Sequence, residues 1–171
     1  MASVTMQDDN CGATRELAAY ACGLRFDAIP AAVVGKAKSC VLDAVGCMLF
    51  GSTLPWTRIV AETVREEGGA ERATLVGTGD RTSITQAVLV NATAGHAFEL
   101  DDYHNAKLHP GAVVIPAAIA MSEKLGSDGK RLVTAIAAGY EVMIRSSLAL
   151  NPSATRLRGW HITGVCGPLG A

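Results

Sequence analysis

Helical spacing of apolar residues is the feature that most restricts the fold of this chain. Hydrophobic side chains recur every three or four residues over 14–25, 30–50 and 128–148, as they do in helices that bury one face. Pro30 suits the first turn of the second segment, and Gly51 suits its end. We therefore predict an all-α fold that resembles a helical bundle.

Shorter helices are predicted over 55–68, 83–96 and 113–125. Ser83 and Gln86 have the spacing of a capping box at the start of the second of these helices. Residues 73–79 are the only short segment with a β-like composition. Because a single strand has no partner, we expect an extended connector there and not a sheet.

Composition restricts the class of function. The 171 residues are 49% hydrophobic and 18% charged, which excludes a disordered chain. The net charge of −1 gives no basic surface for nucleic acid. The N-terminus lacks the pattern of a signal peptide, and no apolar run of about 18 residues is free of charges, glycine or proline. We predict a soluble, cytoplasmic protein that binds neither nucleic acid nor membrane, with its five cysteines as buried thiols.

The domain organisation follows from the same patterns. Residues 1–12 are polar and are predicted to be a flexible N-terminus, and residues 13–171 are predicted to form one helical domain. The chain stops at Leu169–Ala171, within an apolar segment that should continue into a helix, so we expect a domain truncated at its C-terminal end. Such a domain would expose apolar helix faces and would be marginally stable and prone to self-association.

Reactive side chains are concentrated between two apolar helices. They are His96, Glu99, Asp101, Asp102, Tyr103, His104, Lys107 and His109. A polar cluster in this setting is either a solvated loop or the lining of a site.

Three kinds of site are compatible with these groups. A metal could take ligands from Asp101, Asp102, His104 and His109, but neither an HExxH nor a paired CxxC motif is present. A nucleophilic triad would lack its GxSxG motif. General acid–base chemistry fits best, because carboxylates beside histidines hold some groups charged and others close to neutrality. We expect neither a metal nor a cofactor.

His161 is a second candidate, because it stands in a glycine-rich segment that opens a predicted helix. With Gly159 and Gly164 on either side, the backbone N–H groups of the helix start could bind a carboxylate of the substrate. The alternative is that His161 only caps the helix or packs against it.

Five segments resemble the MmgE/PrpD family and occur in the family's order. They are 42–47 (LDAVGC), 95–104 (GHAFELDDYH), 108–118 (LHPGAVVIPAA), 138–145 (AGYEVMIR) and 159–164 (GWHITG). The second and third carry the family's acidic run and the His-Pro motif that follows it. Together the segments are highly specific, and the resemblance extends from about residue 15 to the end of the chain.

The resemblance implies part of the family's large helical domain, with the smaller α/β lid domain absent from this chain. Members include 2-methylcitrate dehydratase, cis-aconitate decarboxylase and iminodisuccinate epimerase. We therefore expect dehydration, decarboxylation or epimerisation of a small di- or tricarboxylate such as 2-methylcitrate, in a homodimer. The alternative is a catalytically inactive helical fragment that serves only as a dimerisation or interaction module.

Matching positions imply catalytic roles for His109, His161, Asp101 and Asp102. The histidines would act as acid or base, and the carboxylates would orient them and favour their charged forms. The residues expected to bind substrate are Glu99, Tyr103, Lys107, Gly159 and Gly164.

Two of these positions depart from the family pattern. Tyr103 stands at a usual threonine, and Glu99 stands where relatives often have aspartate. Both changes alter the size of the pocket and therefore the choice of substrate. The resemblance also implies that lysines and a tyrosine of the site lie beyond residue 171.

Overall fold

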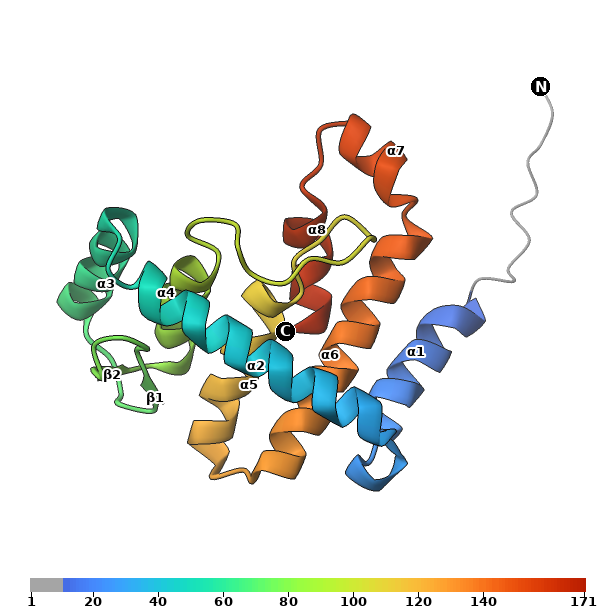
Figure 1. The fold of residues 1–171 in the computed structure, drawn as a ribbon, viewed down its shortest axis with the longest axis horizontal. Helices are drawn as coiled ribbons and strands as arrows, with labels where there is room; N and C mark the ends of the chain where they lie inside the picture. The colour runs from blue at the N-terminus through green and yellow to red at the C-terminus, as the bar shows by residue number, and fades with distance from the viewer. Residues whose placement is uncertain (1–10) are drawn as a thin grey trace.

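The computed structural model describes residues 11–171, which form an arrangement of helices with one small β-hairpin (Figure 1). The helices are α1 (Cys11–Gly23), the short 3₁₀ helix η1 (Phe26–Ala28), α2 (Ala31–Gly51), α3 (Pro55–Glu67), α4 (Ile84–Gly95), α5 (Gly111–Leu125), α6 (Gly129–Ala149), α7 (Pro152–Leu157) and α8 (Ile162–Gly170). The strands are β1 (Ala73–Thr74) and β2 (Arg81–Thr82). The predicted all-α class is confirmed. Residues 1–10, most of the predicted flexible N-terminus, lie outside the described residues, and α1 begins within the predicted 1–12 segment.

Helix α2 crosses the middle of the molecule and contacts α4, α5 and α6 (Figure 1). Its buried face includes the small side chains of Cys40 and Ala44, and Met48, which has no exposed surface. Small side chains allow helix axes to approach closely. At Gly51, a β-carbon would collide with the backbone carbonyl of Ala94, so the crossing of α2 and α4 requires glycine at this position.

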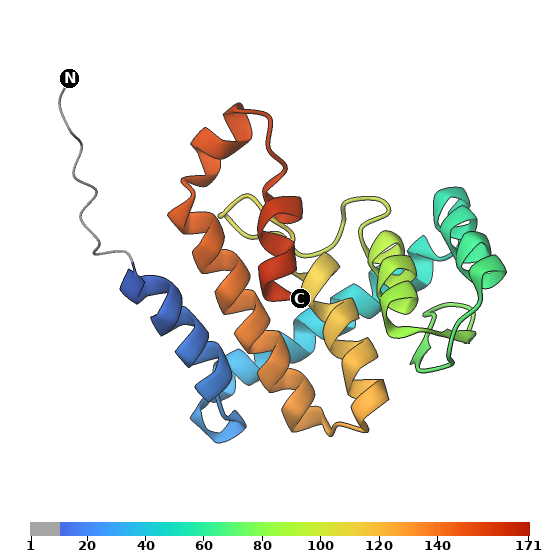
Figure 2. The ribbon, with the colours of Figure 1, turned by 180° about the vertical axis from the view of Figure 1, so that it is seen from behind.

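Helices α5 and α6 are neighbours joined by a short turn (Figure 2). Gly126 ends α5 with a left-handed backbone, φ 59°. Asp128 then caps α6, because its side chain accepts a hydrogen bond from the Arg131 N–H at 2.9 Å. The predicted cap at Asp128 and the predicted break at Asn151–Pro152 are both confirmed.

A buried cluster holds the segment between α4 and α5 against the rest of the fold. Ala106 and Leu108 have no exposed surface and belong to a cluster with Met143 of α6 and Cys166 of α8. The buried Ser147 hydroxyl of α6 donates a hydrogen bond to the Ala106 carbonyl at 2.6 Å. The chain between α4 and α5 is therefore anchored at its centre.

Two local predictions are wrong. Residues 73–79 are not an isolated connector, because Ala73–Thr74 pairs antiparallel with Arg81–Thr82. The partner strand has only two residues, which is too short to show an alternating pattern. Ser83 precedes α4 as predicted, but its hydroxyl donates to Gln86 Oε1 (2.8 Å) and caps no backbone N–H, so no capping box forms.

The cysteines are free thiols wherever the structure describes their side chains. Cys40, Cys47 and Cys166 are buried, as predicted, whereas Cys22 is exposed. Burial is the main cause that raises the pKa of each of the three buried thiols. A thiol that stays protonated is a poor nucleophile, so these three are packing residues.

Among the described helices, α6 alone has the length and composition that would allow it to cross a membrane. It contacts α1, α2, α5 and α8 within the fold. Its buried residues include Ile136 and Met143, while Glu141 and Arg145 form an ion pair on its surface. Packing against neighbouring helices buries one face of α6, and 28% of its apolar window is buried in the fold.

Candidate active site

The candidate site lies where the chain leaves α4 and enters α5, in the loop above α2 (Figure 1). His96 closes α4, because its backbone N–H donates to the Ala92 carbonyl at 3.1 Å. The loop folds back on itself at a bridge between His104 and Leu108. Pro110 then starts α5. This path brings residues that are five to thirteen positions apart into one cluster.

Asp101 is the centre of the cluster. Only 1% of its side chain is exposed. Its Oδ1 lies 2.8 Å from His96 Nδ1, and its Oδ2 lies 3.3 Å from His109 Nδ1. One buried carboxylate therefore faces two histidines, whose rings meet edge to face with centroids 4.8 Å apart.

His109 is held from several sides. Its backbone N–H donates to Thr163 Oγ1 of α8 at 3.1 Å, and the ring of Tyr103 lies edge to face with its own ring at 5.5 Å. His109 Nδ1 and Asp101 Oδ2 are both buried and have no hydrogen-bond partner. The imidazole is therefore well positioned, while the polar atom that faces Asp101 is unsatisfied.

Asp102 has a different role from its neighbour. Its Oδ2 accepts a hydrogen bond from the Tyr140 hydroxyl at 2.7 Å, and its Oδ1 accepts one from the Gly111 N–H at 2.8 Å. Burial and the charge of Asp102 together raise the pKa of Tyr140 far above its usual value. A β-carbon on Gly111 would lie 2.5 Å from Asp102 Oδ1, so a larger residue here would displace the Asp102 carboxylate. Asp102 thus ties the start of α5 to α6, and within residues 11–171 it forms no hydrogen bond or ion pair with a histidine.

A cavity of about 630 Å³ lies on the Asp102 side of the loop. Asp102, Tyr103 and Tyr140 lie on its wall, together with Lys36 of α2. His104 and Pro110 of the loop also line it, and the remaining wall is mainly apolar and comes from α1, η1, α2, α6 and the residues beside them. A largely apolar pocket with a few polar groups at one side suits a small organic molecule.

The other predicted residues of the loop do not join the cluster. Glu99 and Lys107 are exposed and have left-handed backbones, with φ 51° and φ 62°. His104 uses ring Nδ1 to accept the Ala106 N–H at 3.1 Å. Of the four ligands considered for a metal from the sequence, only Asp101 and His109 lie together.

His161 caps α8. Its ring Nδ1 accepts the Gly164 N–H at 3.3 Å, the contact expected of a capping residue. Gly159 has φ 87°, which explains the glycine before Trp160. Because Thr163 of the same helix contacts His109, the start of α8 lies beside the loop of the cluster. His161 therefore has the capping role that was its alternative in the sequence analysis. Its ring already binds the Gly164 N–H, one of the N–H groups at the start of α8.

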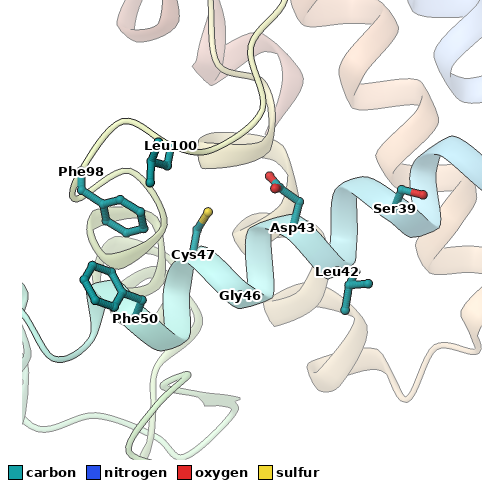
Figure 3. A pocket seen from close by; sticks show the side chains of 8 residues that line it. All are labelled: Ser39, Leu42, Asp43, Gly46, Cys47, Phe50, Phe98 and Leu100. Atoms are coloured by element: carbon teal, nitrogen blue, oxygen red, sulfur yellow. The ribbon is translucent and has the colours of Figure 1, made fainter.

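A second, more open hollow of about 770 Å³ lies between α2 and the first part of the loop (Figure 3). The rings of Phe50 and Phe98 meet edge to face with centroids 4.8 Å apart, and Leu100 lies next to them. Leu42 and Leu100 are 76% and 73% exposed. Asp43 projects from α2 toward the loop (Figure 3). This surface is mainly apolar, and Asp43 is the one carboxylate among its lining residues.

Sequence reasoning missed three contributors to the site. No role in the loop is predicted for His96, and Tyr140 and Thr163 are included only within segments that resemble the family. The spacing of His96 and Asp101, five residues apart across the end of a helix, was an available signal. The contacts of Tyr140 and Thr163 span 38 and 54 residues and have no local signature.

Chemically, the cluster can exchange protons. A histidine that is fixed by its backbone and faces a carboxylate is a suitable general acid or base. Two ring nitrogens and one carboxylate oxygen can also bind a metal ion, and His96, Asp101 and His109 form such a group within the described residues.

Comparison with known proteins gives the family. Residues 15–171 match the model of the MmgE/PrpD N-terminal domain. The chain is 35% identical over 169 residues to a cis-aconitate decarboxylase of Aspergillus terreus, covering 94% of this chain and 34% of that protein. It is 31% identical to a cis-aconitate decarboxylase-like protein of Aspergillus oryzae, covering 96% of this chain and 36% of that protein.

The human cis-aconitate decarboxylase is 27% identical, covering 87% of this chain and 32% of that protein. The chain therefore spans about a third of the length of these relatives. The matched residues include the entire loop from His96 to Pro110 and the start of α8. With a family model that covers residues 15–171, this chain belongs to the MmgE/PrpD family.

Proposed function

We propose that this chain is the N-terminal helical part of a lyase that performs acid–base chemistry on a small di- or tricarboxylate without a cofactor. The observation that carries the proposal is the contact of Asp101 with His96 and His109 at 2.8 Å and 3.3 Å. Membership of the MmgE/PrpD family supports an enzymatic role for these groups. The protein would be soluble and cytoplasmic.

His109 is the proposed acid or base. Asp101 Oδ2 lies 3.3 Å from its ring Nδ1 and orients the imidazole for proton transfer. His161 is the second proposed acid or base, since α8 begins beside the His109 loop. Its ring would have to give up the Gly164 N–H to act in this way.

We propose decarboxylation of cis-aconitate, or of a closely similar tricarboxylate, as the reaction. The names of relatives at 27–35% identity support this choice over dehydration or epimerisation. Loss of CO₂ leaves the electron pair of the broken carbon–carbon bond on the substrate, and a carbon atom must then accept a proton. Protonated His109 could deliver that proton, and a later proton from water would restore the histidine.

Binding of a polyanion beside Asp101 and Asp102 requires positive charge to offset their repulsion. Protonated histidines supply part of it. Lys36 of the cavity wall and Lys107 of the exposed part of the loop are the proposed cations on this chain. Glu99, Tyr103, Gly159 and Gly164 remain proposed contacts of the substrate. We propose that the rest of the cationic pocket comes from sequence corresponding to the other two thirds of the relatives.

The test is turnover by this chain when it is joined to the remaining two thirds of the Aspergillus terreus relative, here called the extended protein. We expect the extended protein to release CO₂ from cis-aconitate faster than it converts 2-methylcitrate, and to remain active in EDTA. The 171-residue chain alone should show no turnover, because positioning and exclusion of water need a closed site. Turnover of 2-methylcitrate alone, or a requirement for a metal, would contradict the proposal.

A homodimeric, non-enzymatic module is the second candidate function. The exposed apolar side chains of Leu42, Phe50 and Leu100 favour it, because large apolar patches usually mark contact surfaces. We propose a second copy of the chain as the occupant. Sedimentation should then show a dimer that the double substitution Leu42→Lys and Leu100→Lys converts to a monomer. A dimer together with an inactive extended protein would favour this function over catalysis.

A further inference from the structure

His96, Asp101 and His109 each offer one ligand atom, and these atoms lie within 4.8 Å of one another. Two imidazole nitrogens and one carboxylate oxygen are a ligand set that Zn²⁺ uses when it keeps one position open. Bonds of about 2.1 Å to one ion place neighbouring ligand atoms roughly 3 to 3.5 Å apart. The distance between His109 Nδ1 and Asp101 Oδ2, 3.3 Å, lies in that range. His96 Nδ1 is paired with the other oxygen of Asp101, Oδ1, at 2.8 Å, so this contact would be exchanged for the ion.

Two unsatisfied atoms point into the same space. Asp101 Oδ2 and His109 Nδ1 are buried and face each other at 3.3 Å, but neither forms a hydrogen bond, and the Asp101 side chain is 99% buried. Buried polar atoms are nearly always paired, since leaving them unpaired destabilises the fold. A cation between these atoms would satisfy both of them.

The cluster is open enough for an ion to enter. The side chains of His96 and His109 are 27% and 20% exposed, so a bound ion could also keep a water ligand. The other nearby candidates are engaged elsewhere, since Asp102 binds Tyr140 and Gly111. The ligand set is therefore limited to three residues.

We propose that His96, Asp101 and His109 form an inhibitory binding site for Zn²⁺ or for another divalent ion that prefers nitrogen and oxygen ligands. Each histidine contributes one ring nitrogen and Asp101 contributes Oδ2. Because a coordinated imidazole has lost the lone pair that proton transfer needs, the ion blocks His109. The inhibitory effect rests on the proposed function of His109, whereas binding of the ion does not.

Calorimetric titration of Zn²⁺ into the 171-residue chain tests the binding. The exposed thiol of Cys22 is first removed with Cys22→Ser, so that it cannot compete for the metal. We expect one site, and at least tenfold weaker binding in each of His96→Asn, Asp101→Asn and His109→Asn. His104→Asn is the matched control, because it removes a histidine of the same loop while an asparagine oxygen can still accept the Ala106 N–H. It should leave the dissociation constant unchanged.

Co²⁺ absorption of the Cys22→Ser chain gives a second readout that does not depend on the folding of the other variants. Visible bands without thiolate-to-metal bands in the near ultraviolet are expected for a site of nitrogen and oxygen ligands. Thiolate bands, unchanged affinity in all three ligand variants, or no saturable binding would overturn the site. In the extended protein, Zn²⁺ should suppress turnover and EDTA should restore it. Binding with no inhibition would leave the metal site in place but refute its inhibitory role and count against His109 as the acid–base group.

Discussion

Asp101 Oδ2 and His109 Nδ1 face each other at 3.3 Å, and both atoms are buried without a hydrogen-bond partner. The second oxygen of the same carboxylate lies 2.8 Å from His96 Nδ1. The neighbouring Asp102 turns away and binds Tyr140 and the start of α5. The two adjacent acidic residues therefore have different roles: Asp101 acts electrostatically on the histidines, and Asp102 joins parts of the fold.

Asp101→Asn removes the charge beside His109 while keeping the shape of the side chain. Because the imidazolium form of His109 loses its buried partner, we expect kcat of the extended protein to fall at least about tenfold, with a smaller change in KM. Steady-state kinetics at neutral pH measure the effect. An unchanged kcat would show that the negative charge of Asp101 does not contribute to catalysis.

Tyr140→Phe tests the structural task of Asp102. It deletes the hydroxyl that donates to Asp102 Oδ2 and leaves a partly buried carboxylate oxygen with one partner fewer. Hydrogen bonds to charged groups contribute about 1.5–3 kcal/mol, so the free energy of unfolding should fall by about that amount. Denaturant titration of the 171-residue chain measures it.

Tyr20→Phe is the control for this substitution. Tyr20 is 44% exposed, and a similar loss of one hydroxyl there should change the free energy of unfolding by less than about 0.5 kcal/mol. Equal effects of the two substitutions would show that the contact between Tyr140 and Asp102 does not stabilise the fold.

Alkaline pH should destabilise the protein through Tyr140 and Cys40. Burial and Asp102 raise the pKa of both groups in the folded state, above their ordinary values of 10.0 and 9.0. Below the ordinary pKa of such a group, it is protonated in both the folded and the unfolded chain, and the free energy of unfolding keeps its full value. Above that pKa the group ionises in the unfolded chain but not in the folded chain, and the free energy of unfolding decreases. The free energy of unfolding should therefore fall as pH increases from about 9 to 11. In Tyr140→Phe the decrease above pH 10 should be shallower, and parallel pH curves for the two proteins would refute this.

Much of the fold was predictable because its signals are local. The helix start at Asp128 and the helix break at Asn151–Pro152 depend on residues within one turn, and the spacing of apolar residues shows which face of α2 is buried. The short helix α7 that follows the break was not predicted. The β-hairpin was missed because its second strand is too short to show a pattern. The Ser83 hydroxyl also had a competing partner, the Gln86 side chain, which no spacing rule reveals.

The candidate site was predictable only in part. The acidic–histidine loop stands out by composition, and the structure does bring Asp101 to His109. The path of the loop after His96 determines which carboxylate faces the histidines. No pattern in the sequence distinguishes Asp101 from Asp102. The role of Tyr140 depends on a contact between α6 and the loop that only tertiary packing produces.

Gly51→Ala tests the close crossing of α2 and α4. The added β-carbon would collide with the Ala94 backbone carbonyl, which cannot move without shifting α4. We expect the free energy of unfolding to decrease by about 1–3 kcal/mol, the usual cost of overpacking. Gly35→Ala is the matched control in the same helix, because its β-carbon meets no atom within 4 Å. That substitution should stabilise the chain by up to about 1 kcal/mol, and equal changes at the two positions would contradict the packing argument.

The most direct test of the central claim is the turnover of cis-aconitate by the extended protein carrying His109→Ala. The account holds that His109, positioned by Thr163 and facing Asp101, transfers the proton of the reaction. Loss of a positioned acid or base should lower kcat by about 100-fold or more, with folding checked by circular dichroism. A folded His109→Ala protein that releases CO₂ from cis-aconitate within about twofold of the unsubstituted rate would contradict the account.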